Sequence, residues 1–350
     1  MRIAILGLPT SGKSTVFRSL TNQPGASAEE AVASVKVPDE RIDKLSALYK
    51  PRKTIYASVE FLDLGAAAGM RKESSELGQR FLNAVRPAAA LLHVLDGFSV
   101  PEAAAEAAAE AVQVIDTELG LADLAQVEKR LERLRKEGLK AVPAKQEAEL
   151  LERVRAVLAE GRPLRSEPEL ARTEALRSFA FLSAKPMLTV LNTAEGSGEA
   201  LLQALPAAVR AARQGVNGAL LGMAGQLESE IAALPPEDAR AFLADYGIAA
   251  PARERVLRAG YELLGLQSFF TVGEDEVRAW TLRKGGVAVE AAAEIHSDLA
   301  RGFIKAEVVP WNTVLEHQGF EEARKAGKLR LEGKEYPVKD GDVISIKFNV

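Results

Sequence analysis

The start of this chain constrains its fold more than any other stretch. Residues 2–6 (RIAIL) form a short apolar run with the β-branched content of a buried parallel strand. The run ends at Gly7, and residues 7–15 (GLPTSGKST) fit the pattern G-x-x-x-x-G-K-[ST] at every specified position. Apolar residues at helical spacing continue to Leu20. The stretch therefore predicts a strand, a glycine-rich loop and a helix in direct succession.

This loop has the chemistry that a phosphate site needs. Glycines let backbone N–H groups close around phosphate oxygens, and a helix N-terminus adds partial positive charge beneath them. Lys13 can reach the β- and γ-phosphates of a nucleotide and assist catalysis, and the Ser14 hydroxyl can ligate Mg²⁺. The simpler alternative is an ordinary glycine turn. The residues predicted to bind nucleotide here are Gly7, Pro9, Ser11, Gly12, Lys13, Ser14 and Thr15.

Composition limits the remaining classes of function. With 350 residues, 47% of them apolar and 27% charged, the chain is expected to be globular with more than one domain. It has no cysteine, leader-like segment or membrane-length apolar run, so we expect a cytoplasmic protein without a membrane partner. A net charge of −4 argues against DNA binding, and an RNA contact would need a local basic patch.

A second predicted strand carries a candidate metal ligand at its end. Residues 54–63 alternate apolar and polar side chains until Asp63. In a phosphate-loop fold, an acid at this point supports Mg²⁺, so Ser14 and Asp63 form the predicted metal site. A turn cap is the alternative role for Asp63. A GTPase-like D-x-x-G pattern would need glycine at Ala66, and no glutamine follows to orient water, which argues against fast hydrolysis.

The stretch before that strand lacks a residue that phosphate-loop switches use. Residues 23–34 show no clear period and are expected to form a loop. A threonine from such a loop commonly contacts Mg²⁺ and the γ-phosphate. None lies between Thr21 and Thr54, so Ser27 and Ser34 are the nearby hydroxyl candidates. A short helix is predicted over residues 39–49.

Two later buried strands are predicted at residues 88–95 and 186–191. His93 lies within the first and is interpreted as a core residue. The second ends at Asn192 and Glu195, spaced as N-x-x-E where a GTPase carries N-K-x-D. Aspartate reads guanine by accepting two hydrogen bonds from one edge, and glutamate is one methylene longer. The spacing predicts weakened guanine preference, with Asn192 and Glu195 as base-contacting candidates.

A charged helical region separates those two strands. Apolar residues at three- and four-residue steps predict one helix, and a second stripe follows the break at residues 138–143. The pattern indicates an antiparallel helical hairpin. Residues 129–177 carry a small basic excess, compatible either with an RNA-facing surface or with an ordinary solvated face. The apolar residues of the first stripe are Leu121, Leu124, Val127, Leu131 and Leu134.

Several segments resemble a known family. In the C-terminal third they are residues 258–264 (RAGYELL), 276–281 (EVRAWT), 295–296 (IH), 301–304 (RGFI), 338–342 (VKDGD) and 348–350 (FNV). Upstream they are residues 7–9 (GLP), 43–45 (DKL), 61–63 (FLD), 77–78 (LG) and 117–119 (TEL), with Asn192 and Glu195. On these residues the chain resembles the YchF / Obg-like ATPase family of P-loop proteins over nearly its full length.

The resemblance implies both a fold and a function. The fold is an α/β P-loop NTPase sheet of G-domain type in residues 1–116 and 184–266, with an antiparallel helical hairpin inserted at 117–183. Residues 267–350 would form an α+β domain of β-grasp (TGS) type. The function would be binding of ATP, or also GTP, with Mg²⁺, slow or stimulated hydrolysis, and association with the ribosome or RNA. The alternative is a diverged, non-hydrolysing nucleotide-binding or scaffold protein that contacts RNA or protein through its hairpin and TGS domain.

Some positions depart from the family pattern. Ala66 replaces the switch glycine, and Ala67 replaces a larger hydrophobic residue. Residues 99–116 lack the family's second histidine, and Ala194 replaces an asparagine of the base motif. These departures lie in the switch and base motifs, whereas residues 7–9 of the phosphate loop match the family.

Overall fold

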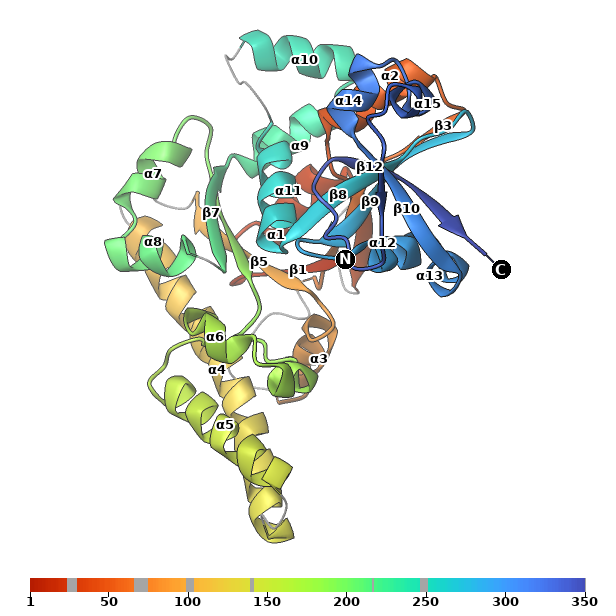
Figure 1. The fold of residues 1–350 in the computed structure, drawn as a ribbon. Coiled ribbons are helices and arrows are strands. Elements are labelled where there is room, and N and C mark those ends of the chain that lie inside the picture. The colour runs from red at the N-terminus through yellow and green to blue at the C-terminus, as the bar shows by residue number, and fades with distance from the viewer. Residues whose placement is uncertain are drawn as a thin grey trace. The chain divides into compact units, whose positions relative to one another are not determined.

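The computed structural model describes residues 1–23, 30–65, 75–98, 104–138, 142–215, 217–245 and 251–349. Its contacts divide the chain into two compact units. Unit 1 contains Met1–Ser34 and Glu60–Leu263, and unit 2 contains Val35–Val59 and Leu264–Val350. Each unit has its own 6-stranded sheet (Figure 1).

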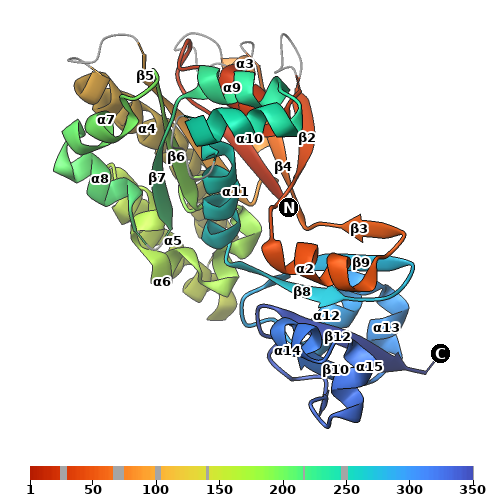
Figure 2. The ribbon, with the colours of Figure 1, turned by 90° about the horizontal axis from the view of Figure 1, so that it is seen from above.

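The sheet of unit 1 has the strand order β2-β4-β1-β5-β6-β7 (Figure 2). Strand β1 runs parallel to β4 on one side and β5 on the other. The inner strands are buried almost throughout because helices cover both faces, which explains their continuous apolar runs. The strands are β1 (Arg2–Leu6), β2 (Ala31–Lys36), β4 (Ser58–Asp63), β5 (Ala90–Gly97), β6 (Met187–Thr193) and β7 (Gly218–Met223).

Helices surround this sheet. On one face, the long helix α4 packs apolar residues against β5 and β6 in two clusters. Helices α1, α9 and α11 pack together elsewhere in unit 1. The helices of unit 1 are α1 (Lys13–Thr21), α3 (Ser75–Val85), α4 (Ala104–Glu137), α5 (Val142–Ala159), η2 (Leu164–Ser166), α6 (Pro168–Ala171), η3 (Glu174–Phe179), α7 (Gly198–Ala204), α8 (Ala207–Arg213), α9 (Gly225–Ala233), α10 (Pro236–Asp245) and α11 (Ala252–Leu263).

Helices α4 and α5 form the predicted hairpin (Figure 1). Val127 and Leu131 of α4 pack on Leu151 and Val154 of α5, as the two apolar stripes predict. The prediction was wrong for Leu121, whose exposed fraction is 55%. Since α4 is one continuous helix from the sheet to the hairpin tip, its first half turns a different stripe towards the sheet and leaves Leu121 outside.

Unit 2 combines a mixed sheet with helices on both sides. Its strand order is β11-β10-β12-β8-β9-β3, and Phe269, Ala292 and Ala306 lie in a core between the sheet and α12. The strands are β3 (Lys53–Ile55), β8 (Leu266–Thr271), β9 (Glu276–Arg283), β10 (Phe303–Pro310), β11 (Arg330–Glu332) and β12 (Asp342–Phe348). The helices are α2 (Glu40–Tyr49), α12 (Ala288–Ile295), α13 (Ser297–Arg301), α14 (Trp311–Glu316) and α15 (Phe320–Lys325).

The segment Val35–Val59 belongs to unit 2 by its contacts, although it lies between two parts of unit 1 in the sequence. Strand β3 pairs in parallel with β9. The Arg41 side chain donates to Asp340 at 2.8 Å, and the Tyr49 hydroxyl accepts the Phe320 N–H at 2.7 Å. The sequence pattern predicts one strand over residues 54–63. The structure instead has two strands, β3 and β4, separated by Tyr56 and Ala57, because the two strands belong to different sheets. The predicted domain boundaries at 116/117, 183/184 and 266/267 stay predictions.

Candidate nucleotide site

The glycine-rich loop joins β1 to α1, as predicted from its sequence. Gly12 has φ of 86°, a left-handed conformation that favours glycine. A Cβ on Gly12 would lie 2.1 Å from Asn192 Nδ2, and one on Gly7 would lie 2.5 Å from the Val94 carbonyl oxygen. Both positions therefore need glycine because neighbouring strands approach the loop closely.

The Lys13 side chain folds back onto its own loop. Its Nζ donates to the carbonyl oxygens of Gly7 at 3.1 Å and Leu8 at 2.8 Å. Burial lowers the pKa of Lys13, while the negative charge of Asp63 opposes that shift. These contacts hold an ammonium group within the same loop whose glycines are suited to phosphate oxygens.

Ser14 and Asp63 meet beside this lysine. The Ser14 hydroxyl donates to Asp63 Oδ2 at 3.1 Å. Asp63 is fully buried at the end of β4, and its Oδ1 accepts the Gly65 N–H at 3.1 Å. The carboxylate thus also caps a turn, the alternative role considered for it. A hydroxyl and a carboxylate oxygen are the hard donors that Mg²⁺ prefers, so these two residues fit that ion.

Asn192 connects the phosphate loop to helix α9. Its side chain is 4% exposed. The Nδ2 atom donates to the Ser11 carbonyl at 3.2 Å, and Oδ1 accepts the Gly225 N–H at 3.1 Å. Both ends of the amide are therefore engaged within the protein. Sequence reasoning identified Asn192 but missed Gly225, which lacks a motif of its own.

Glu195 lies three residues beyond Asn192, in the turn after β6, at a hollow of about 350 Å³. The hollow is formed by the segments that follow β6 and β7, including Ala194, and by Arg255 of α11. Glu228 contributes to its wall and accepts the N–H groups of Ala252 at 2.7 Å and Arg253 at 3.3 Å. Glu228 is a second residue that sequence reasoning missed, because nothing local marks an acid that caps a distant helix.

The other residues considered for the site differ in burial, and some lie outside the described part of the chain. Pro9 is exposed at the tip of the loop, Ser11 is 3% exposed, and Thr15 is half-buried in the first turn of α1. Ser34 lies in β2, which begins within the stretch expected to be a loop. Ser27, Ala66 and Ala67 lie outside the described residues, as do residues 99–103.

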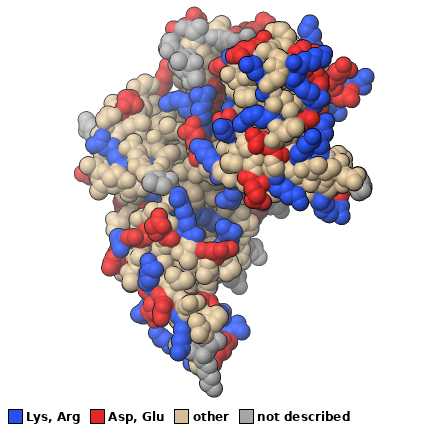
Figure 3. Space-filling model, viewed as in Figure 1, with Lys and Arg blue, Asp and Glu red and all other residues tan. Residues whose placement is uncertain are grey.

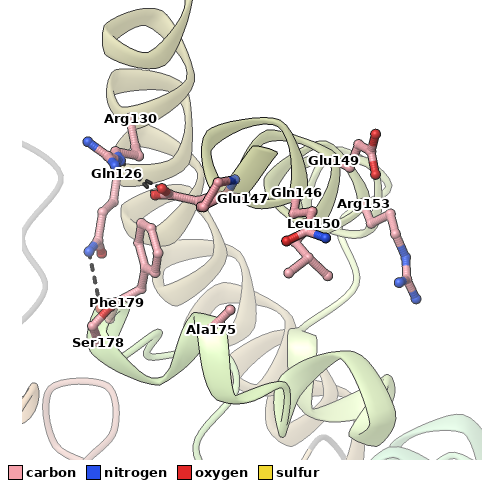
Figure 4. A pocket seen from close by; sticks show the side chains of 11 residues that line it. Gln126, Arg130, Gln146, Glu147, Glu149, Leu150, Arg153, Ala175, Ser178 and Phe179 are labelled. Carbon is pink, nitrogen blue, oxygen red and sulfur yellow. Dashed lines mark hydrogen bonds and ion pairs between the residues drawn. The ribbon is translucent and has the colours of Figure 1, made fainter. Parts of the chain in front are cut away.

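A second hollow, of about 910 Å³, lies in the hairpin (Figure 4). Phe179 and Leu150 line it together with Gln126, whose Nε2 donates to the Phe179 carbonyl at 3.1 Å. Across it, Arg130 donates to both carboxylate oxygens of Glu147 at 2.7 and 2.8 Å. The residues that line this hollow include none of the predicted nucleotide-binding residues.

The hairpin surface mixes charges of both signs. Glu132 pairs with Lys136 at 2.7 Å, and Arg135 pairs with Glu152 at 2.9 Å. Figure 3 shows blue and red residues interspersed along the hairpin on the face in view. Ion pairs within the hairpin therefore engage several of its basic side chains, and the net basic excess of residues 129–177 is carried by the others.

Two family models match the chain. Residues 2–141 match a model described as "50S ribosome-binding GTPase", and residues 266–349 match "YchF-GTPase_C", described as a protein of unknown function. "Ribosome-binding ATPase YchF" of Bacillus subtilis is 37% identical over 364 residues, which cover 99% of this chain and 98% of that protein. The chain belongs to the YchF family.

Other YchF relatives agree over the full length. "Ribosome-binding ATPase YchF" of Pasteurella multocida is 36% identical and covers 100% of this chain and 99% of its own. "Obg-like ATPase 1" of Oryza sativa is 34% identical, covering 100% and 92%. The solved "Structure of the Schizosaccharomyces pombe YchF GTPase" matches with a TM-score of 0.81 and 30% identity, covering 99% of this chain and 97% of that one. The resemblance and the predicted fold class are confirmed.

The names of the relatives do not agree on whether adenine or guanine nucleotide is bound, since the curated relatives are called ATPases and the solved structure a GTPase. The rate of hydrolysis is likewise a prediction. Within the part of the chain that the structure describes, no helix is long and apolar enough to cross a bilayer.

Proposed function

We propose that this YchF protein is a cytoplasmic nucleotide-dependent switch that binds ATP, and GTP less well, together with Mg²⁺. The observation that carries the proposal is the contact between Ser14 and Asp63 at 3.1 Å. Lys13 lies directly beside it, and its ammonium group donates to a carbonyl oxygen of the glycine loop. An ordinary glycine turn would need neither the buried acid nor the lysine inside the loop.

Each residue of the site would have its own role in binding and catalysis. Lys13 would neutralise charge on the β- and γ-phosphates, and the N–H groups at the start of α1 would bind phosphate oxygens. Ser14 and Asp63 would hold Mg²⁺, which supplies further charge stabilisation when bound. Catalysis then depends on positioning and electrostatics. Ala67 stands where a GTPase carries its water-orienting glutamine, so we propose slow hydrolysis that a partner stimulates.

We also propose that this partner is the ribosome. The support is the printed name of the full-length relatives, "Ribosome-binding ATPase YchF". The hairpin and unit 2 are the candidate contact elements, because neither contains the phosphate loop, Asp63 or Asn192. The alternative is a scaffold role in which nucleotide is bound without turnover.

One experiment separates the switch from the scaffold. Lys13→Ala should abolish ATP turnover and remove the effect of nucleotide on co-sedimentation with ribosomes. The matched control is Lys44→Ala, which changes an exposed lysine of α2. If Lys13→Ala leaves ribosome binding and its nucleotide response intact, the switch proposal is wrong and the scaffold role is supported.

A further inference from the structure

One buried carboxylate joins the first turns of two helices in unit 1. Glu228 lies in the first turn of α9 and is 6% exposed. Its Oε1 atom accepts the Ala252 N–H at 2.7 Å, and its Oε2 atom accepts the Arg253 N–H at 3.3 Å. Ala252 and Arg253 are the first two residues of α11. A single side chain therefore holds the start of α9 against the start of α11.

Helix α11 uses this carboxylate as its N-terminal cap. The first N–H groups of a helix have no acceptor within it. The Glu254 N–H bonds to the Pro251 carbonyl at 3.0 Å, so the two N–H groups before it need an acceptor from outside the helix. A carboxylate suits this position because the helix dipole places partial positive charge there. Capping alone would give Glu228 a structural role.

The same turn of α9 also carries a contact of the nucleotide site. Helix α9 begins at Gly225, and the preceding Ala224 provides no side-chain cap. The Gly225 N–H instead donates to Asn192 Oδ1 at 3.1 Å, and Asn192 Nδ2 donates to the Ser11 carbonyl at 3.2 Å. The Glu228 N–H closes the turn by donating to the Ala224 carbonyl at 2.9 Å. One helical turn thus connects Glu228 to the residue that Asn192 holds.

This turn lies close to the phosphate loop and to α1. A Cβ on Gly225 would lie 2.5 Å from Asn192 Oδ1 and 3.6 Å from Thr15 Cγ2 in α1. Helix α9 also packs against α1 (Figure 1). Because close-packed interiors transmit displacements, a shift of the first turn of α9 would change the position of the Asn192 amide.

We propose that Glu228 is a positioning residue for nucleotide binding. By anchoring the first turn of α9 to α11, it fixes the Gly225 N–H, which orients the Asn192 amide and thereby supports the phosphate loop. This inference rests on the nucleotide-binding function proposed above. Since Glu228 acts through the loop, it supports binding of the phosphates that ATP and GTP share and leaves the choice of base unchanged.

Nucleotide titration of Glu228→Gln in the full chain tests this role. Glutamine has nearly the same shape but loses the charge and one accepting oxygen. With Mg²⁺, we expect the affinities for ATP and GTP to fall by the same factor, about three to ten, in Glu228→Gln and further in Glu228→Ala. A change in the ratio of the two affinities would mean that Glu228 acts on the base, and would overturn the proposal.

Asp123→Asn is the matched control for the loss of a buried cap. Asp123 of α4 is 0% exposed, and its carboxylate accepts the Leu182 N–H at 2.9 Å and the Ser183 N–H at 2.7 Å. The replacement should lower Tm at least as much as Glu228→Gln does, but leave nucleotide affinity unchanged. Equal losses of affinity in the two variants would reduce Glu228 to a structural role and overturn the proposal.

A double-mutant cycle tests the route through Asn192. If Glu228 acts by orienting this amide, Glu228→Gln should lower ATP affinity by less than about twofold further in an Asn192→Ala background. Independent, additive losses in the double variant would show that Glu228 does not act through Asn192, and would overturn the proposal.

Amide hydrogen exchange separates this inference from the proposed function, because it needs no nucleotide. The phosphate loop and α1, residues 7–21, should exchange faster in Glu228→Gln than in the wild type, and at the wild-type rate in Asp123→Asn. Unchanged exchange in Glu228→Gln would overturn the positioning role even if the wild type binds ATP. Faster exchange in a protein that binds neither nucleotide would support the positioning of the loop and refute only the nucleotide function.

Discussion

The side-chain amide of Asn192 holds the Ser11 carbonyl at 3.2 Å on one side and the Gly225 N–H at 3.1 Å on the other. The residue predicted to read the base is therefore also the one that ties the phosphate loop to α9. Its two hydrogen bonds are buried, so neither can be replaced by water without cost.

Asn192→Ala should lower the free energy of unfolding by about 1–3 kcal/mol, because it leaves a buried carbonyl and a buried N–H unpaired. It should weaken ATP and GTP binding by similar factors, since the loop that binds their shared phosphates loses its support. Denaturant unfolding and nucleotide titration measure the two effects. Glu195→Ala is the control, expected to alter the ratio of ATP to GTP affinity with little change in stability. A selective loss of ATP binding in Asn192→Ala would contradict this account.

Two glycine substitutions should act in opposite directions. Gly12→Ala places a Cβ 2.1 Å from Asn192 Nδ2 at a φ of 86°, so we expect lost nucleotide binding and destabilisation of about 1–3 kcal/mol. Gly120→Ala, in the middle of α4, meets only a Leu158 methyl at 3.9 Å and should stabilise by about 0.5–1 kcal/mol. Thermal unfolding of both variants checks the pair. If Gly12→Ala changed neither the stability nor nucleotide binding, Asn192 would not approach the loop so closely.

Arg41 should contribute strongly to the stability of unit 2. It pairs with Asp39 and Asp340, each at 2.8 Å, and lies over the Phe270 ring at 5.3 Å. Arg41→Ala should cost about 1–2 kcal/mol and increase amide hydrogen exchange in residues 264–349. Arg52→Ala is the matched control, because its pair with Asp275 is 85% and 84% exposed and should contribute little. Equal exchange in the two variants would argue against the grouping of residues 35–59 with unit 2.

Lys185 gives unit 1 a defined pH dependence. Burial lowers its pKa from 10.5 to about 8, while its Nζ still donates to the carbonyls of Arg86 and Ala88. Between pH 8 and 10.5 the unfolded chain keeps a proton that the folded chain has lost. The Lys185 contribution to stability therefore rises with pH across that window, by up to about 3 kcal/mol.

The check for Lys185 is a difference measurement. The free energy of unfolding of the wild type minus that of Lys185→Met should increase from pH 7.5 to pH 10. Taking the difference removes the titration of every other group. A difference that stays flat over this range would mean that Lys185 is not desolvated in the folded protein.

Local sequence was enough to predict the parts of the site that lie close together along the chain. The glycine loop, Lys13 and Ser14 depend on neighbouring residues, and β-strand alternation placed Asp63 at the end of β4. The stripes of α4 and α5 predicted their mutual contact for the same reason.

Long-range partners could not be predicted in this way. Residues 35–59 show ordinary helix and strand patterns, and nothing in them indicates that their sheet and core partners lie beyond residue 263. The meeting of Asp116, Arg165 and Arg213 depends on three separate elements, and single charged residues carry no periodic signal. The bond between Asn192 and Gly225 likewise joins a residue of β6 to the first residue of α9.

The central claim is that Lys13, Ser14 and Asp63 form a site for ATP with Mg²⁺, and calorimetric titration of nucleotide-free protein tests it most directly. ATP and GTP are each titrated with Mg²⁺ and with EDTA, into the wild type and Asp63→Asn. The account predicts tighter binding of ATP than of GTP, and a gain from Mg²⁺ that Asp63→Asn loses. Absence of binding, or affinity that is equal with Mg²⁺ and EDTA in the wild type, would contradict it.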